Sequence, residues 1–239
     1  MPFTRLAGVD GCRAGWVLAS SDLALRVLEF DLYRSFADLL AAHSHPDTLL
    51  VVDIPIGLPR SDPRACDIQA RKLLGPGRAS SVFPAPSRAA LAAKTYEEAC
   101  SANFAAAGRR ISRQLYSILP KIHQVDALMT PELQARVREA HPEVTFHLLA
   151  SRRGGESLAR KKTLAGEAKR LDLLLHAVSR FDPVAVRAKL GLGHVGRDDI
   201  IDAVACLVTA RRIATGEAMV LPPSCVQRDE RGLRVEIAA

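Results

Sequence analysis

The stretch TLLVVDIPIGLP, residues 48–59, limits the possible folds most, because it is a nearly continuous apolar run with Asp53 inside it. A strand that is apolar on both faces is typical of a parallel sheet covered by helices on both sides. Parallel neighbours also need a crossover connection between them. We therefore expect an α/β fold in which this run supplies a buried parallel strand that ends at Asp53.

The segments before this run predict its partners. Three apolar segments come first, LAGVDG (6–11), GWVLASS (15–21) and LALRVLEFDL (23–32), and Asp22 between the last two is a hairpin signal. In SFADLLAAHS (35–44) the apolar residues have helical spacing, and Ser35 is the expected N-cap. The three strands can pair as an antiparallel meander, and the helix is long enough to place the fourth strand parallel to one of them.

The second half of the chain predicts further helices and one more strand. Residues 60–130 combine a basic loop rich in Gly, Pro and Ser with helical spacing, and we interpret them as a helical insertion or lid. A strand is expected at RVREAHP (136–142), and helices are expected after Pro142, from about Thr163 to Arg180, and from Arg197 to about Gly216. The prediction is a single domain over residues 1–239.

The composition sets outer limits on function. The net charge of +7 is compatible with a phosphate-bearing partner and equally with a basic surface, because Lys and Arg are spread along all 239 residues. Five cysteines without a CxxC spacing argue against a zinc ribbon. The sequence shows neither a signal-peptide h-region nor an apolar run of bilayer length, so we expect a cytoplasmic protein with no membrane association.

Two apolar strands end in an aspartate, one at Asp10 and one at Asp53. In open α/β sheets, sites form outside the carboxyl ends of parallel strands. If the two strands are neighbours, their aspartates can share one cation. The alternative is that Asp10 serves an Asp-Gly turn and Asp53 ends a strand before Pro55.

The stretch RDDIIDAV (197–204) places three more aspartates at the start of the last helix. Capping explains Asp198 as the N-cap and Asp199 in the first turn, where the helix dipole favours negative charge. Capping explains Asp202 less well, because a strongly apolar segment follows it and a buried carboxylate needs a partner. Asp199 and Asp202 share one face of the helix, so both are candidate ligands and catalytic residues.

Glu143, in HPEVTF, follows the expected strand at 136–142 and is a further catalytic candidate at the same edge. It can equally be a first-turn glutamate behind Pro142. Glu139, within the strand, is a secondary candidate. Clustered carboxylates without cysteine select hard cations such as Mg²⁺ or Mn²⁺, and two such ions about 4 Å apart could hydrolyse a phosphodiester.

Several motifs together resemble one known family. They are GVDGCRAGWV, VVDIPIGLP, the R-x-C-D-x-x-A-R run at 64–71, SSVFPAPSR, HPEVTF, KKTLAGEAKR and RDDIIDAV, between Leu6 and about Arg212. The chain is similar to the domain-of-unknown-function family numbered four-two-nine, described as predicted RNase H-like nucleases. The resemblance implies a mixed RNase H-like sheet in the order 3-2-1-4-5 with strand 2 antiparallel, flanking helices and a metal site at Asp10, Asp53, Asp199 and Asp202. Resolvase-type nucleases often have Glu at the position of Asp53.

Basic residues could contact a substrate. Arg64, Asp67 and Arg71 have helical i, i+3/i+4 spacing, which suits an ion-pair ladder, although the resemblance favours substrate contact. Arg78 lies in the loop GPGRASS, and Lys161 and Lys162 precede a helix that Thr163 is expected to cap. The lysines could neutralise a nucleic-acid backbone or form a solvated basic turn.

Three functions fit these observations. The first is a nuclease that uses Mg²⁺ or Mn²⁺ to hydrolyse nucleic acid, with DNA and RNA both open. The second is a phosphotransferase of the actin-like and sugar-kinase type, for which the chain is short because those proteins have a duplicated domain. The third is a nucleic-acid-binding or protein-binding module without catalysis. A homodimer is compatible with each.

Overall fold

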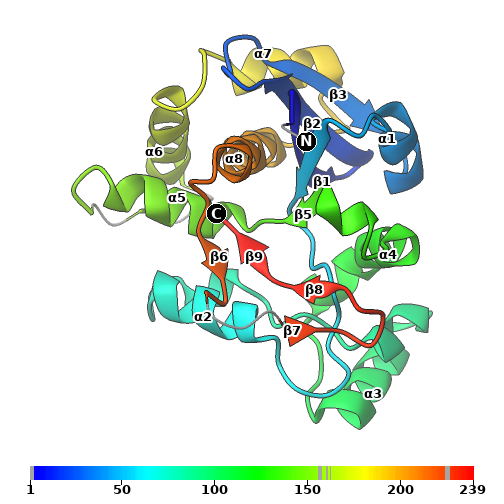
Figure 1. Cartoon of the computed structure of the whole chain (residues 1–239). Helices are drawn as coiled ribbons and strands as arrows, with labels where there is room; N and C mark the ends of the chain where they lie inside the picture. Colours follow the sequence, from blue (N-terminus) through cyan, green and yellow to red (C-terminus); the bar gives the residue numbers. More distant parts are fainter. Residues whose placement is uncertain (1–2, 156–157, 160, 162, 224–226) are drawn as a thin grey trace. The chain divides into compact units, whose positions relative to one another are not determined.

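This computed structural model contains a five-stranded mixed sheet in the order β3-β2-β1-β4-β5 (Figure 1). The structure describes residues 3–155, 158–159, 161, 163–223 and 227–239. The strands are β1 (Arg5–Cys12), β2 (Gly15–Asp22), β3 (Glu29–Tyr33), β4 (Thr48–Val52) and β5 (Val137–Glu139). β2 is antiparallel to β1 and β3, and β4 is parallel to β1 and β5. The predicted strand order and the antiparallel second strand are therefore confirmed.

The chain divides into two compact units, each built from separate stretches of sequence. The first unit contains residues 1–53, 136–219 and 238–239, and the second contains residues 54–135 and 220–237. The sheet belongs to the first unit. The segment 60–130, for which we expect an insertion or lid, lies entirely in the second unit, and a lid function stays a prediction.

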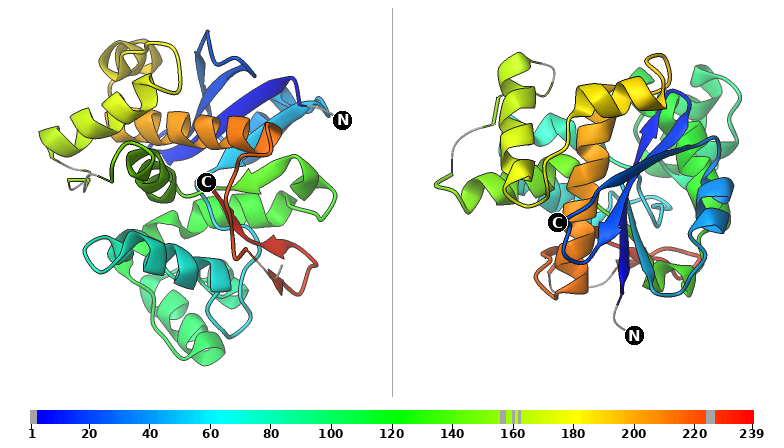
Figure 2. Two further views of the ribbon diagram at one scale, coloured as in Figure 1. Left: turned by 60° about the vertical axis from the view of Figure 1, so that its left-hand side comes forward. Right: turned by 90° about the horizontal axis from the view of Figure 1, so that it is seen from above.

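Helices cover both faces of the sheet in the first unit. They are α1 (Phe36–Ala42), α5 (Pro142–Ser151), α6 (Leu164–Leu175), α7 (Pro183–Leu190) and α8 (Arg197–Ala214). α8 packs against β1, β2 and β4, and α1 lies on the opposite face against β2 and β3 (Figure 2). α5, α6 and α7 contact α8, so α8 is buried along most of its length.

The helix boundaries follow from caps. The side chains of Ser35 and Thr163 accept hydrogen bonds from backbone amides three residues on, as the sequence predicts. α6 ends at Leu175, so the predicted extension to Arg180 is wrong. The segment after α6 instead contacts the loop between β2 and β3, where the amide of Ser179 donates to the carbonyl of Leu25.

The second unit is mostly helical. Its elements are α2 (Ala65–Leu74), η1 (Ala79–Ser81), η2 (Arg88–Ala92), α3 (Tyr96–Ala107), α4 (Arg113–Leu128), η3 (Leu133–Ala135) and the antiparallel pair β7 (Gln227–Arg228) and β8 (Arg234–Val235). The short strands β6 (Val220–Leu221) and β9 (Ile237–Ala238) lie on either side of that pair in sequence. Gly108, with a φ of 65°, separates α3 from α4.

Gly8 lets the backbone of β1 touch the backbone of α8. A Cβ atom at this position would lie 2.1 Å from the carbonyl oxygen of Ala203 and 2.1 Å from the amide nitrogen of Leu207. Neither backbone atom can rotate away as a flexible side chain could. The close approach therefore depends on glycine, and it sets the distance between α8 and the strand that carries Asp10.

We predict that Gly8→Ala destabilises the first unit by about 3 kcal/mol, because the added methyl group forces α8 away from β1. Trp16 is the single tryptophan, lies in β2 and is fully buried, so its fluorescence reports on this unit during urea unfolding. Gly193→Ala is the matched control, because a Cβ atom there would have no heavy atom within 4 Å. Equal unfolding midpoints for the two variants would contradict the steric argument.

Candidate metal centre

Asp10 and Asp53 lie at the carboxyl edge of two neighbouring parallel strands. β1 and β4 pair in register up to Val9 and Val52, and the amide of Asp53 donates to the carbonyl of Val9 over 3.0 Å. The Asp10 side chain accepts a hydrogen bond from the amide of Gly11 over 2.7 Å and is only 9% exposed. The turn role considered for Asp10 is thus present, and it coexists with a position next to Asp53.

Asp202, in the second turn of α8, completes a group of three carboxylates. One ligand oxygen from each of Asp10, Asp53 and Asp202 lies within 4.8 Å of the others. Asp202 is 3% exposed, and its Oδ1 is buried without a hydrogen-bond partner in the part of the chain that the structure describes. A buried carboxylate oxygen with no donor is costly, and a cation would satisfy it. The three residues could therefore hold a divalent metal ion.

Burial and mutual repulsion disfavour the ionised form of this group. Burial raises the pKa of Asp10 well above its ordinary value, and the charges of Asp53, Asp202 and Asp199 raise it further. Burial, followed by the charge of Asp202, raises the pKa of Asp53 to about 8. Burial also raises the pKa of Asp202, although Lys161 opposes the effect. A bound cation would stabilise the ionised carboxylates, so metal binding and proton release are coupled here.

Lys161 lies at the edge of this acidic group and contacts Asp202. Its Nζ atom forms an ion pair with Oδ2 of Asp202 and lies 4.0 Å from Oδ2 of Asp198. Burial lowers the pKa of Lys161, but the charges of Asp202 and Asp10 outweigh that effect and raise the pKa overall, so the side chain is an ammonium. A solvated basic turn, one of the two readings of this motif, does not describe Lys161. Lys162 lies outside the described residues.

The other two aspartates of RDDIIDAV have different roles. α8 begins at Arg197 with Gly196 as its N-cap, so the prediction that Asp198 is the N-cap is wrong. The carboxylate of Asp199 accepts a hydrogen bond from the amide of Gly196 over 2.8 Å. Asp199 is near enough to raise the pKa of Asp10, but the group of three found among the described residues does not include it.

Glu143 is held by an arginine. Both of its carboxylate oxygens accept hydrogen bonds from Arg170, from Nε and Nη2, each over 2.9 Å, and both side chains are buried. This bidentate pair joins α5 to α6, and no sequence pattern predicts it, because the partners are far apart in the chain. Glu139 lies beside the strand that leads to Asp53: it pairs in register with Val52 at the end of β5, and its charge raises the pKa of Asp53. Its place as the last residue of a parallel strand is the sequence signal that favours Glu139 as a site residue.

Two of the arginines considered for substrate contact hold the second unit together. Arg64 is 1% exposed and donates to both carboxylate oxygens of Asp67 and to the carbonyls of Ile56 and Gly57. The ion pair of Arg64 with Asp67 is therefore buried, and a ladder of ion pairs at the surface is the wrong description. Arg71 donates to the carbonyls of Ala79 and Val82 and so fixes the loop that follows α2. Arg78, also in that loop, is half-buried and stays a predicted substrate contact.

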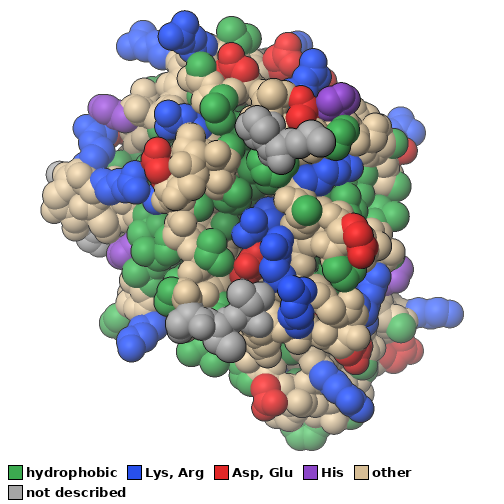
Figure 3. All heavy atoms as spheres, viewed as in Figure 1, with side chains coloured by type: hydrophobic (Ala, Val, Ile, Leu, Met, Phe, Trp, Pro, Cys, Tyr) green, Lys and Arg blue, Asp and Glu red, His purple; other side chains and the backbone are tan. Residues whose placement is uncertain are grey.

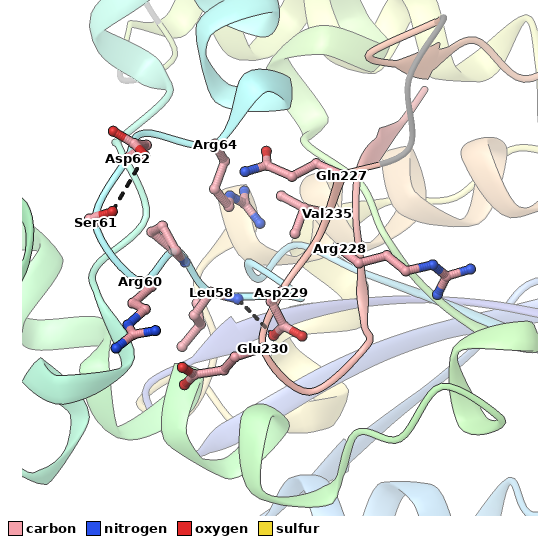
Figure 4. Close-up of a pocket in the computed structure, with 11 residues that line it drawn as sticks. Leu58, Arg60, Ser61, Asp62, Arg64, Gln227, Arg228, Asp229, Glu230 and Val235 are labelled. Atoms are coloured by element: carbon pink, nitrogen blue, oxygen red, sulfur yellow. Dashed lines mark hydrogen bonds between the residues drawn. The ribbon is translucent and has the colours of Figure 1, made fainter.

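A hollow of about 280 Å³ lies in the second unit beside Arg64 (Figure 4). It is lined by residues of the 58–64 loop and of the β7–β8 hairpin, among them Arg60, Asp62, Arg228 and Glu230. Positive and negative side chains are mixed around it, and Asp229 is engaged by the amide of Leu58 and by Arg88. The hollow thus lacks the concentration of one charge that a phosphate site needs.

The surface charge is similarly mixed. On the face shown in Figure 3, Lys and Arg side chains are scattered among acidic and apolar ones.

Within the described residues, no helix is long and apolar enough to cross a membrane.

Comparison with known proteins identifies the family. The model of the family described as "Protein of unknown function (DUF429)" matches residues 8–226, which is most of the chain. The chain therefore belongs to this family, as the motifs suggested. No curated protein and no solved structure matches the chain significantly.

The raised pKa values predict that metal-free protein loses stability as the pH rises. An unfolded aspartate titrates near pH ~4, whereas folded Asp53 has a pKa of about 8. Between these values the folded state holds a proton that the unfolded chain releases, so the free energy of unfolding falls with rising pH. Urea unfolding in EDTA, followed by Trp16 fluorescence, should show this fall, and Asp53→Asn should reduce it. The exposed control Asp172→Asn should keep the wild-type profile; an equal effect of both substitutions would contradict the assignment.

The Glu143–Arg170 pair predicts a structural effect. Glu143→Gln leaves the buried charge of Arg170 uncompensated, so we expect a loss of about 3 kcal/mol in the free energy of unfolding. Asp172, which pairs with Arg153 at the surface, supplies the control: Asp172→Asn should cost less than about 1 kcal/mol. A Glu143→Gln variant with wild-type stability and weakened metal binding would instead place Glu143 in the metal centre.

Proposed function

We propose that this protein is a divalent-metal-dependent nuclease that hydrolyses phosphodiester bonds. The observation that carries the proposal is the convergence of Asp10, Asp53 and Asp202 at one edge of the sheet, with a buried oxygen of Asp202 that lacks a donor among the described residues. A purely structural trio of aspartates would be expected to have hydrogen-bond donors at each buried oxygen.

The chemistry of the donors favours Mg²⁺ or Mn²⁺. All three candidate ligands are carboxylates, which are hard oxygen donors, and the group of three contains none of the four buried cysteines that the structure describes. Carboxylates that share a small space hold such an ion while leaving coordination positions for water and phosphate oxygens.

In the proposed hydrolysis, the side chains bind the metal ion and the metal ion activates water. Asp10, Asp53 and Asp202 would bind the ion, and the strand ends and the buried helix would hold these ligands rigidly. When bound, the ion lowers the pKa of a water molecule and withdraws charge from the phosphoryl group. The water oxygen adds to phosphorus, one phosphorus–oxygen ester bond breaks, and the departing oxygen takes up a proton.

Nucleic acid is the proposed substrate for two reasons. The net charge of +7 favours association with a polyanion. In addition, an acidic centre on this sheet order agrees with the nuclease reading that the motif resemblance implies. A cleavage assay distinguishes DNA from RNA, and single-stranded from duplex and branched forms.

The test is cleavage by the full-length protein of labelled DNA and RNA in single-stranded, duplex and branched forms, with Mg²⁺, Mn²⁺ or EDTA. We expect metal-dependent cleavage of at least one form, and a loss of more than about 100-fold in Asp10→Asn and Asp202→Asn, because each removes a metal ligand. Asp172→Asn, on the exposed side of α6, should retain the wild-type rate. Absence of cleavage by folded protein, or cleavage that survives both EDTA and the ligand substitutions, would refute the proposal.

A further inference from the structure

The two oxygens of the Asp202 carboxylate are in different environments. Oδ2 forms the ion pair with the ammonium of Lys161, whereas Oδ1 is buried and has no hydrogen-bond partner within the described part of the chain. One side of this ligand is thus already neutralised by a residue of the protein. Only the other side is available to a divalent ion.

Two further carboxylates considered as site residues, Glu143 and Asp199, already have partners. Both oxygens of Glu143 accept hydrogen bonds from Arg170. One oxygen of Asp199 accepts a hydrogen bond from the amide of Gly196. The group with converging ligand atoms is limited, among the described residues, to three aspartates. One divalent ion and one ammonium would balance the three negative charges of that group.

Lys161 also has access to a substrate. Its side chain is 34% exposed, whereas that of Asp202 is 4% exposed, so the ammonium lies at the boundary between the buried carboxylates and solvent. A lysine ammonium has three N–H donors. Asp202 takes one, and Asp198, at 4.0 Å, is beyond hydrogen-bonding distance. Donors therefore remain for a phosphate oxygen.

We propose that Lys161 is the second cation of this centre: the site takes one divalent metal ion, and the Lys161 ammonium contacts the phosphate where a two-metal site would place its other ion. This inference rests on the proposed nuclease function and deepens it. In this role Lys161 stabilises charge on the phosphate oxygens and transfers no proton. It replaces the expectation of two metal ions drawn from the acidic sequence pattern.

The first test counts metal ions. Mn²⁺ binding to the full-length protein, measured by calorimetry and by electron paramagnetic resonance of free Mn²⁺, should give one ion per chain for wild type. Lys161→Met should take up a second ion, because Oδ2 of Asp202 is released. Lys161→Arg, which keeps the charge, should bind one, as should the control Lys189→Met, which removes a charge from the exposed end of α7. Trp16 fluorescence confirms that each variant is folded.

The second test measures cleavage at a Mn²⁺ concentration that fills only the first site. Lys161→Met should lose about 100-fold in rate, as expected when one donor to the phosphate is removed, and Lys161→Arg should recover much of it. A wild-type rate in Lys161→Met would show that Lys161 is a counter-ion only and overturn the inference.

The outcomes separate the two proposals. Two Mn²⁺ ions per wild-type chain, or a single ion in Lys161→Met, would overturn the role of Lys161 and leave the nuclease proposal intact. One ion per wild-type chain with a second in Lys161→Met, but no cleavage of any nucleic acid, would refute the nuclease and support a one-ion centre completed by lysine. No bound ion would refute both.

Discussion

The contact between the backbones of β1 and α8 at Gly8 determines where the acidic centre lies. Because no side chain separates the strand from the helix, Asp202 on α8 approaches Asp10 on β1 closely enough to share a ligand position with it. β4 adds Asp53 through the parallel register that pairs Val9 with Val52. The centre is therefore a consequence of how one helix lies on two strands, and the rigidity of these elements would hold the ligands in place.

This arrangement works against the stability of the fold. Three carboxylates with raised pKa values share a buried space, which is unfavourable for their ionised forms. Lys161 offsets part of this repulsion through its ion pair with Asp202. The surrounding core, which contains α8 buried along its length, supplies the remaining stabilisation. Buried ionisable groups with strongly shifted pKa values cluster at functional sites. The three aspartates are therefore the strongest candidate for a functional site among the described residues.

The sequence predicted the elements that depend on local pattern. Periodicity and the aspartates at strand ends were enough for the first four strands and for Asp10, Asp53 and Asp202, because a strand end or a helix face fixes where such residues point. The order of the strands in the sheet came from the family resemblance. The sequence could not predict partners that only tertiary packing brings together, such as Arg170 for Glu143 or Asp202 for Lys161. Buried pairs of this type leave no periodic signal. The cap of α8 was misplaced because Gly196 competes for that position with the more usual aspartate.

The division of the chain into interleaved units has a consequence for the order of events during synthesis. β4 leaves the ribosome before residues 54–135, whereas its partner β5 and the helix α8 emerge only after them. The sheet therefore stays incomplete, with one apolar edge uncovered, until β5 has been synthesised. The second unit stays incomplete until residues 220–237 have been synthesised. Neither unit can close before most of the polypeptide exists. Pairing across so long a separation is slow, and strand edges stay exposed to aggregation until β5 and α8 have been made.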